Sequence, residues 1–387
     1  MSIRGRAFIA GAYEHPLREI PDLSSSQIQA ECAAGALADA GLTFADVDGY
    51  FTDSAHGLGG LSMADYLGLR LCHVDSTETG GSSYIVHVGH AAEAIAAGKC
   101  SVALVTMAGR PRTTGMRGAQ PTEPVPDSVF EGLWGLSGAV TGYAMAAARH
   151  MYQYGTTSEQ LAEVKVAASL HAQHNPQAFL RKPVTVEEVL ASPMVSSPLH
   201  RDDCCVVTDG GGAVVIVSPE VAASLHRTCV KVLGQGEAIK HTDSGRVDLT
   251  YTGAVVSGPR AFAEAGVTPA DIKYASIYDS FTITVVETLE DLGFCEKGQG
   301  GKFVAGGALV APFGRLPFNT DGGGLCNNHP SNRGGMTKII EAVRQLRGEA
   351  NEAVQVPNCN LALAHGTGGN IATRMASATL ILGQEDA

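Results

Sequence analysis

A segment of eleven residues occurs twice in the chain, and this repeat limits the folds that the sequence can adopt. Residues 36–46 read Ala-Leu-Ala-Asp-Ala-Gly-Leu-Thr-Phe-Ala-Asp, and residues 261–271 read Ala-Phe-Ala-Glu-Ala-Gly-Val-Thr-Pro-Ala-Asp, so seven of the eleven positions are identical. Each copy joins the end of a helical pattern to a turn. Each then leads into an apolar run typical of a strand, residues 47–51 or 274–278.

The elements expected after each copy also follow the same order. A glycine run precedes a helical pattern, the helical pattern ends at a glycine, and a buried strand pattern follows. These features lie at residues 80–81, 98 and 101–108 in the first half, and at residues 322–324, 348 and 360–365 in the second half. A shared order of elements predicts a duplicated α/β unit.

The middle of the chain interrupts this order. Residues 110–200 combine a polar, proline-bearing loop, two helical patterns and a second proline-rich stretch, which together predict a loop domain inserted between strands. We therefore expect a first half over residues 1–219, which includes the loop domain at about 110–200, and a second half over residues 220–387.

Composition excludes several classes of protein. The net charge is −12, from 39 acidic and 27 basic residues, which argues against binding to nucleic acid or to an anionic membrane surface. No apolar run is long enough to span a bilayer. The nine cysteines are scattered without a Cys-x-x-Cys pair, which predicts a reduced, cytoplasmic protein, and no histidine spacing predicts a metal site.

Several segments resemble thiolases, in particular thiolase-like proteins of the sterol-carrier and lipid-transfer type. The similar segments are Asn319–Pro330, which contains three glycines and then Asn-Asn-His-Pro, Glu341–Gly348, Tyr278–Phe281, His365–Gly369, Cys204–Gly210 and Tyr154–Gln160. The resemblance implies two thiolase-like α/β halves in five layers, αβαβα, with a loop domain over the active site. It also implies a homodimer and a coenzyme A thioester as substrate, with no covalently bound cofactor.

The chain departs from thiolases at the position of the nucleophile. Thiolases carry a cysteine at a helix N-terminus, where the thiol pKa is lowered. The matching position here is Gly81, or Ser82 with a shift of one residue, and residues 74–99 contain no cysteine. Ser280 stands where the sterol-carrier type has a second cysteine. Cleavage through an acyl-cysteine is therefore not expected.

The thiolase-like residues other than the nucleophile are of the kind that stabilise an enolate. Thiolase-like proteins without the cysteine, and with Tyr-Asp-x-Phe, resemble the aldolases that split β-hydroxyacyl-CoA thioesters in steroid side-chain degradation. By this resemblance we expect a retro-aldol cleavage in which His329 stabilises the enolate and Tyr278 is the base. A basic Tyr278 requires that nearby positive charge or hydrogen bonds lower its pKa from about 10.

Other candidate residues have weaker support. His365 and Ser280 are further catalytic candidates, and Gly81, Ser82 and Gly368 are candidate backbone donors to an oxyanion. Ser82 and Ser83 are expected to cap their helix through the hydroxyl groups. Arg181 and Lys182 are candidates for binding the phosphates of coenzyme A, beside a second basic cluster at Arg110, Arg112 and Arg117. We expect Asn319 to fix its loop.

Two alternatives to the aldolase remain open. The chain could be a thiolase or acetyl-CoA acyltransferase that acts on a 3-ketoacyl-CoA, or a non-catalytic subunit that binds acyl-CoA or lipid. The resemblance to the steroid aldolases also implies a small partner protein with a zinc-bearing OB-fold.

Overall fold

The computed structural model describes most of the chain. The described residues are 2–53, 58–115, 129, 132–133, 135–136, 138–240, 246–330, 334–371 and 373–385. They form a nine-stranded sheet, a two-stranded ribbon and the helices around them.

The first half contains the strands β1 to β7. In chain order its elements are β1 (Phe8–Glu14), α1 (Ser25–Ala40), η1 (Phe44–Asp46), β2 (Gly49–Phe51), α2 (Gly60–Tyr66), β3 (His73–Asp75), η2 (Gly80–Ser82), α3 (Ser83–Ala96), β4 (Val102–Gly109), α4 (Pro111–Thr114), α6 (Gly138–Tyr154), α7 (Ser158–Ala172), α8 (Val186–Ala191), β5 (Met194–Ser196), β6 (Leu199–His200), η3 (Arg201–Asp203), β7 (Gly210–Val217) and α9 (Pro219–Ser224).

The second half contains the strands β8 to β11. Its elements are β8 (Val230–Ile239), α10 (Ala254–Ala265), η5 (Pro269–Asp271), β9 (Tyr274–Ile277), α11 (Thr282–Asp291), α12 (Gly300–Val304), the π-helical turn η6 (Gly323–Asn327), α13 (Gly335–Arg347), η7 (Glu352–Val354), β10 (Leu361–Asn370) and β11 (Thr373–Gly383).

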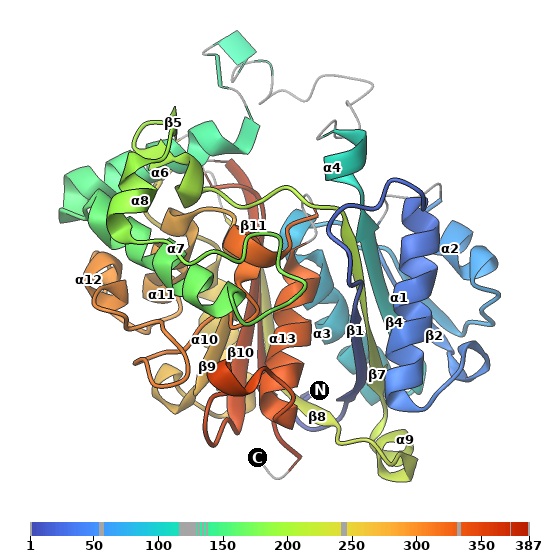
Figure 1. Ribbon diagram of the computed structural model, residues 1–387. Helices are drawn as coiled ribbons and strands as arrows, with labels where there is room; N and C mark the ends of the chain where they lie inside the picture. Colours follow the sequence, from blue (N-terminus) through green and yellow to red (C-terminus); the bar gives the residue numbers. More distant parts are fainter. Residues whose placement is uncertain are drawn as a thin grey trace.

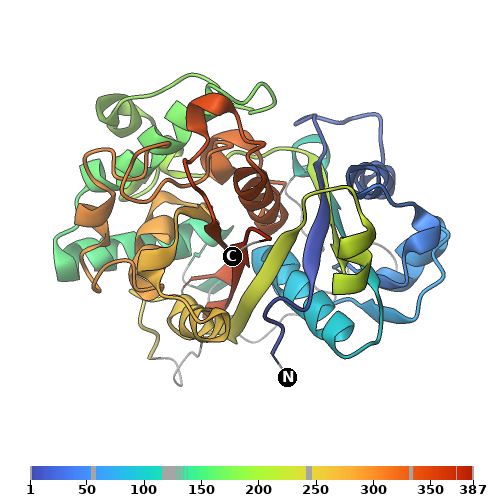
Figure 2. The same ribbon diagram turned by 90° about the horizontal axis from the view of Figure 1, so that it is seen from below.

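Strand order confirms the duplication. The first half has the order β2-β4-β7-β1 and the second half β9-β10-β11-β8, and β3 extends the first half at its edge. In both halves the first pair is parallel and the next two pairs are antiparallel. The halves meet where β1 pairs with β8, so the two expected sheets form one continuous hydrogen-bonded sheet. Figure 2 shows these two strands side by side at the junction.

The halves stack in five layers. In Figure 1, α1 and α2 cover the outer face of the first-half strands, α3 and α13 lie between the two sets of strands, and α10 and α11 cover the second-half strands. Both α3 and α13 contact strands of both halves, which makes them the shared central layer. The predicted thiolase-like αβαβα fold is confirmed, whereas a boundary between residues 219 and 220 stays a prediction.

The repeated segment has the same local structure in both copies. Each copy ends its helix at a glycine in the left-handed region, Gly41 with φ 73° and Gly266 with φ 68°. Each then forms a short 3₁₀ turn in which an aspartate accepts hydrogen bonds from a threonine, Asp46 from Thr43 and Asp271 from Thr268. The identical residues are therefore those that this helix end and turn require.

The inserted segment covers the end of the second-half strands at which β9 and β10 finish. Helices α6 and α7 carry buried alanines that pack into the same core as α11 and β10. The proline-rich stretch, expected to be irregular, contains α8, β5 and β6. Part of the expected polar loop, including Arg117, lies outside the described residues.

Candidate active site

Tyr278 and His329 face each other across one cavity. Tyr278 directly follows β9, where its backbone N–H donates to the His365 carbonyl at 3.0 Å. Its ring meets the His329 ring edge-on, with the centroids 5.3 Å apart and the planes at 73°. Both side chains are buried and line a cavity of about 370 Å³. The two side chains therefore share one pocket.

The cavity is enclosed by the inserted segment and by the ends of the second-half strands. Its wall consists of Gly138, Ala139, Val140, Tyr143, Val195, Arg201, Cys204, Cys205, Val207, Tyr278, Ser280, Phe281, His329, Thr367, Gly368 and Gly369. Tyr143 stacks on Phe281 at 4.4 Å between ring centroids. Apolar side chains thus form most of the wall, with a few polar groups directed inward, as is usual for small-molecule sites.

His329 is a neutral imidazole at ordinary pH. Burial lowers its pKa to about 4, although the nearby Asp279 carboxylate opposes this change. Its Nε2 is buried and has no hydrogen-bond partner. The backbone N–H of His329 donates to the Thr208 hydroxyl at 2.9 Å, which holds the residue in place. The imidazole is therefore available to accept a proton or to donate a hydrogen bond.

The expected lowering of the Tyr278 pKa is wrong. Burial raises the pKa of Tyr278 well above its usual value, and the nearby Cys205, Tyr143 and Asp279 raise it further. The described surroundings therefore keep the phenol protonated, and a protonated phenol is a hydrogen-bond donor. The sequence could not reveal this, because the reason is complete burial under the inserted segment.

Asp279 ties the glycine turn to the strand that precedes Tyr278. Its carboxylate accepts hydrogen bonds from the backbone N–H groups of Gly324 at 2.7 Å and Leu325 at 3.1 Å, and from Lys338 Nζ at 2.8 Å. An added Cβ at Gly323 would lie 2.2 Å from an Asp279 oxygen, so only glycine allows this approach. The buried Asp279–Lys338 pair therefore sets the position of the turn that leads to His329.

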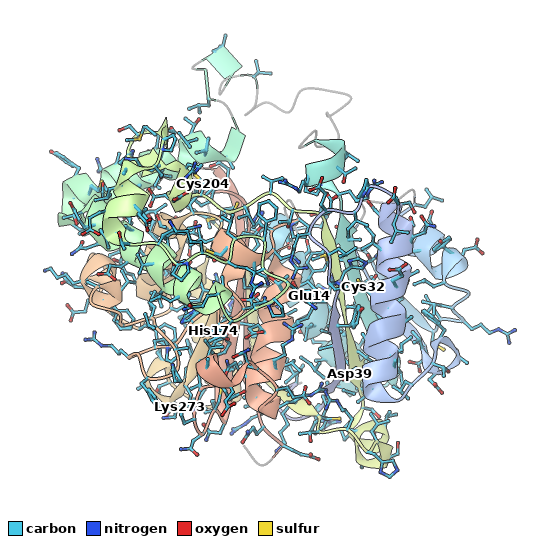
Figure 3. All side chains as sticks on the ribbon, viewed as in Figure 1. Glu14, Cys32, Asp39, His174, Cys204 and Lys273 are labelled. Carbon is cyan, nitrogen blue, oxygen red and sulfur yellow. The ribbon has the colours of Figure 1, made fainter. Side chains whose placement is uncertain are left out.

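Asn328, which replaces a glycine of the thiolase pattern, joins three parts of the chain. Its Oδ1 accepts from the Thr208 hydroxyl at 2.8 Å and its Nδ2 donates to Glu14 at 2.8 Å. Glu14, labelled in the middle of Figure 3, also accepts from Arg18 at 2.8 Å. The substitution therefore links the first half to the loop that presents His329.

Asn319 fixes its loop as expected, because its amide pairs with both backbone groups of Ile277.

The thiolase nucleophile position is filled by other groups. A Cβ added at Gly81 would lie 2.3 Å from the Thr367 carbonyl oxygen and 2.6 Å from Cε2 and Cζ of Tyr278. Gly368 packs against the same turn, because a Cβ added to Gly368 would lie 1.7 Å from the Thr79 carbonyl oxygen. Gly368 lines the cavity, but Gly81 and Ser82 are absent from the described cavity wall. The Tyr278 ring packs against the site where a cysteine side chain would begin.

Ser82 and Ser83 do not act as the expected cap. The Ser82 hydroxyl donates to the Thr79 carbonyl at 2.8 Å, and no side-chain capping bond is present at that end of α3. The Ser83 hydroxyl accepts from the Thr79 N–H instead, at 2.8 Å. The short 3₁₀ turn η2 precedes α3 and brings the Thr79 carbonyl within reach, which sequence spacing did not indicate.

His365 lies outside the cavity and Ser280 lies on its wall. His365 is fully buried in β10, its Nδ1 is 2.9 Å from the Thr379 hydroxyl, and burial lowers its pKa to about 3. The Ser280 hydroxyl is 3.1 Å from the Thr284 hydroxyl and reaches the cavity. Of the two weaker catalytic candidates, only Ser280 is therefore placed to contact a ligand in this cavity.

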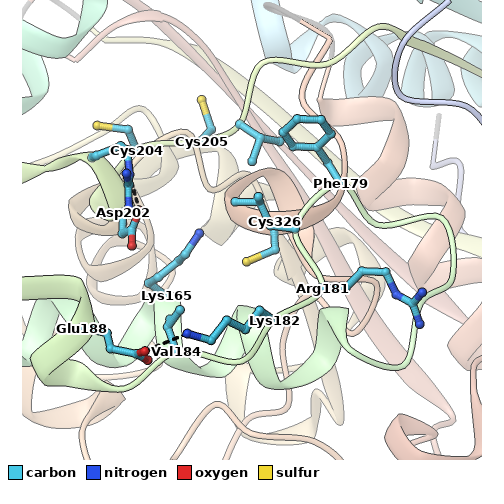
Figure 4. A pocket seen from close by; sticks show the side chains of 13 residues that line it. Lys165, Phe179, Arg181, Lys182, Val184, Glu188, Asp202, Cys204, Cys205 and Cys326 are labelled. Carbon is cyan, nitrogen blue, oxygen red and sulfur yellow. Dashed lines mark hydrogen bonds and ion pairs between the residues drawn. The ribbon is translucent and has the colours of Figure 1, made fainter. Parts of the chain in front are cut away.

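A second cavity adjoins the first and contains the predicted basic residues. It measures about 680 Å³, and Arg201, Cys204 and Cys205 line both cavities. Arg181 and Lys182 stand at its edge in Figure 4, and Lys182 pairs with Glu188 at 2.9 Å. Deeper inside, the buried Lys165 donates to the Leu325 carbonyl at 2.8 Å. The other basic cluster is absent from the described cavity walls: Arg110 and Arg112 bind the segment at residues 19–21, and the Arg112 guanidinium also lies 4.4 Å from the centre of the Phe179 ring, which lines the second cavity.

Sequence patterns missed four residues around these cavities. Tyr143, Thr367, Cys204 and Cys205 line the first cavity, yet none was assigned a role. The segment from Cys204 onward did resemble thiolases, and it runs between two site loops: Cys205 N–H donates to the Ser280 carbonyl and Val206 N–H to the Gly324 carbonyl, both at 2.9 Å. That similarity was the available signal. Tyr143 carried none, because it lies outside the segments that resemble thiolases.

Comparisons with known proteins agree with this geometry. Residues 236–384 match the family described as thiolase C-terminal domain-like. The chain is 34% identical over 95% of its length to an acetyl-CoA acetyltransferase of Methanothermobacter thermautotrophicus, covering 98% of that protein. It is 35% identical over 89% of its length to the 17-hydroxy-3-oxo-4-pregnene-20-carboxyl-CoA lyase of Mycobacterium tuberculosis, covering 92% of that protein. A solved structure described as an Ltp2-ChsH2(DUF35) aldolase is 32% identical, with a TM-score of 0.89 and 99% of each chain covered.

The chain therefore belongs to the thiolase superfamily. The sequence-based recognition is confirmed, and so is the expectation of an enzyme, because the relatives are named as a lyase, an aldolase and an acetyltransferase. Across the described residues, no helix has the length and apolar content that a membrane crossing needs.

Proposed function

We propose that this protein cleaves the carbon–carbon bond of a β-hydroxyacyl-CoA by a retro-aldol reaction. The observation that supports this most strongly is the contact between Gly81 and the Tyr278 ring. A phenol packs where a thiolase nucleophile would start, and it faces a neutral His329 across the cavity. Similarity to a lyase and to an aldolase structure points to the same reaction class.

The two side chains divide the work in the opposite way to that expected from the sequence. His329 Nε2 accepts the proton of the β-hydroxyl. The bond between Cα and Cβ then breaks, its electrons pass to the thioester as an enolate, and the β-carbon becomes a carbonyl. The Tyr278 hydroxyl donates a hydrogen bond to the enolate oxygen, and Cα takes up a proton to complete the product thioester.

Coenzyme A would occupy the second cavity. Its pantetheine arm would pass Cys204 and Cys205 into the first cavity, and its phosphates would meet Arg181 and Lys182 near the opening. Arg201, which lines both cavities, would stand beside the path. Exposed basic side chains at the opening suit the phosphate groups of coenzyme A. In water, long-range electrostatic attraction between opposite charges does not require a fixed geometry.

Acyl transfer is the second candidate, because an acetyl-CoA acetyltransferase is among the full-length relatives. Under this alternative a thiol near the cavity would carry the acyl group. Burial raises the pKa of Cys204 to about 12 and that of Cys205 still further, so neither thiol is activated as a nucleophile. We therefore rank the lyase first. A binding subunit without activity would show tight acyl-CoA binding and no turnover.

We further propose two protein partners. The related solved structure, described as an Ltp2-ChsH2(DUF35) aldolase, supports a protein partner, and we propose that this partner is the expected zinc-bearing OB-fold protein. A homodimer would form along β3, the edge strand of the first half, where Leu61, Tyr66 and Val74 are exposed. Light scattering of the wild type and of Leu61→Asp tests the dimer, and a monomeric wild type would contradict it.

Turnover assays test the reaction itself. β-Hydroxyacyl-CoA and 3-ketoacyl-CoA esters should be compared, the latter with free coenzyme A, each with and without a DUF35 partner. We expect release of a shortened acyl-CoA and a carbonyl product from the β-hydroxy esters alone. Thiolysis of the 3-keto esters, with an acylated protein visible by intact mass, would instead support the acyltransferase.

A further inference from the structure

Helix α11 is buried on every side, yet it carries a polar stripe. Ser280 just before the helix, and Thr284, Glu287, Thr288 and Asp291 within it, are all at most 8% exposed. At 100° per residue these positions fall within about a third of the helix circumference. The stripe begins on the cavity wall, at Ser280, and ends at Asp291. A buried helix has no packing reason for a continuous polar face.

The strands that share a core with α11 carry polar groups too. His365 and Thr367 of β10 lie on the same strand face as Leu363, and Ser377 of β11 pairs directly with Thr367. Leu363 belongs to the hydrophobic core that includes the apolar residues of α11. We call the stripe and these three strand residues together the α11 seam.

Several buried atoms of the α11 seam have no hydrogen-bond partner. They are both carboxyl oxygens of Glu287, the hydroxyls of Thr288 and Ser377, and Nε2 of His365. Buried polar atoms are nearly always bonded to protein or to ordered water. A cluster of such atoms on elements that share one core is therefore the kind of place that holds internal water.

Glu287 lies between the cavity and a charged cluster at the other end of the seam. Burial raises its pKa well above the usual value; Asp291 and Glu290 act in the same direction, against Lys297 and Lys240. Burial also raises the pKa of the cavity residue Tyr143 to about 12, with a contribution from Glu287. Along the stripe, Glu287 lies between Ser280 on the cavity wall and Asp291 in the charged cluster.

The charged cluster opens to the solvent. Lys297 Nζ contacts Asp291 at 2.5 Å and Glu290 at 3.2 Å, and its side chain is one-third exposed. Lys240 Nζ donates to the Ile371 carbonyl at 2.8 Å, and to the backbone carbonyl of the exposed Asp248. One end of the seam therefore reaches the surface and the other reaches the candidate active site.

We propose that the α11 seam is a hydrated proton path between the charged cluster at Lys297 and the active-site cavity, with Glu287 and Tyr143 as its relay groups. This inference rests on the proposed lyase function. There, His329 gains a proton from the β-hydroxyl and the enolate carbon needs one. The seam exchanges protons with solvent by moving them between carboxyl, water and phenol, with no change in oxidation state. Glu287 is a positioning and relay residue and does not touch the substrate.

Infrared spectroscopy tests the path without turnover. The wild type minus Glu287→Gln difference at neutral pH should contain the carbonyl band of a protonated carboxyl group, and this band should shift promptly on transfer to D₂O. Thr288→Val, which keeps the side-chain shape, should retain the band and slow its shift. Ser276→Ala is the matched control, because its unpartnered hydroxyl is equally buried on β9, outside the seam. A missing band, or one that does not exchange in the folded wild type, would overturn the proposal.

Kinetics provide the second arm. For Glu287→Gln we expect kcat to fall about 10- to 100-fold with KM unchanged, less than the loss of about 10²–10⁴-fold for a direct acid–base group. Its solvent isotope effect should rise, whereas Ser276→Ala should match the wild type. Wild-type kcat in folded Glu287→Gln would refute the relay. If the wild type cleaves no β-hydroxyacyl-CoA, the proposed function fails, while the infrared exchange still decides whether the seam conducts protons.

Discussion

The loop before α3 and the loop before α13 occupy corresponding places in the two halves, but they present different chemistry. The first-half loop, residues 79–82, contacts the second half mainly through glycine and backbone atoms. The second-half loop, residues 319–330, carries His329 and is held by Asp279 and Lys338. A duplicated fold therefore supplies two similar frames, and here the second bears the ionisable groups while the first provides a close-packed backbone surface.

Removing the imidazole of His329, in the second-half loop, or the hydroxyl of Tyr278, which follows β9, should have the largest effect. For His329→Ala we expect kcat to fall about 10²–10⁴-fold, the usual loss for a proton-transferring group. For Tyr278→Phe, which retains the ring, we expect about 10²–10³-fold, the loss of one donor to an oxyanion. Steady-state cleavage of a β-hydroxyacyl-CoA measures both. Near-wild-type rates in either variant would remove that residue from the mechanism.

Breaking the buried ion pair should release the second-half loop. Lys338→Met leaves the Asp279 carboxylate buried without its cation, which should lower the free energy of unfolding by about 3–5 kcal/mol. Denaturant titration measures this loss. The exposed pair of Lys182 and Glu188 is the control, since Lys182→Met should cost less than about 1 kcal/mol. Equal losses in the two variants would contradict a special role for the buried pair.

Adding one carbon to the first-half loop tests the glycine contact. Gly81→Ala places a Cβ against the Thr367 carbonyl and the Tyr278 ring, so the phenol must move. A displacement of about 1 Å can reduce turnover about 10²-fold. Gly132→Ala is the control, because its added Cβ meets nothing within 4 Å. If Gly81→Ala retained full activity, the first-half loop would not constrain Tyr278.

The pH dependence should reveal the neutral imidazole. The pKa of His329 is about 4 in the folded protein and near 6.5 when unfolded, so between these values the unfolded chain binds more protons. Stability should therefore fall as pH drops from 6.5 to 4, by about 3 kcal/mol from this residue. Glu287, whose pKa is raised, acts in the opposite sense, with stability falling as pH rises above 4.5. Unfolding of His329→Gln across this range isolates the first contribution, which should disappear.

Replacing the cavity thiols should have the smallest effect. Cys204→Ser and Cys205→Ser each keep a small polar side chain, and neither thiol is activated, so we expect kcat to change less than about tenfold. Alkylation of the wild type by iodoacetamide can still block the cavity, because both thiols line it. If the serine variants stay active and iodoacetamide no longer inhibits them, alkylation inhibits the wild type by blocking the cavity and not by removing a catalytic thiol. Loss of all activity in either variant would favour the acyltransferase.

Local patterns were sufficient to predict the fold and the approximate location of the site. The repeated helix end and turn depend on contacts within a few residues, such as the left-handed Gly41 and the threonine–aspartate turn, so they can be read directly from the chain. The two residues singled out for the reaction, Tyr278 and His329, lie together at one cavity, whereas their catalytic roles stay a prediction.

Only the tertiary structure decided what these residues can do. The protonation of Tyr278 and His329 depends on burial by the inserted segment, whose packing has no local signature. The separation of His365 from the cavity depends on position along β10, because Thr367, two residues further on the same strand face, lines the cavity. The closure of the nucleophile position depends on β10 backbone that is nearly 290 residues away from Gly81 in the chain. Sequence patterns specify local geometry, whereas desolvation and close approach arise only when distant segments pack together.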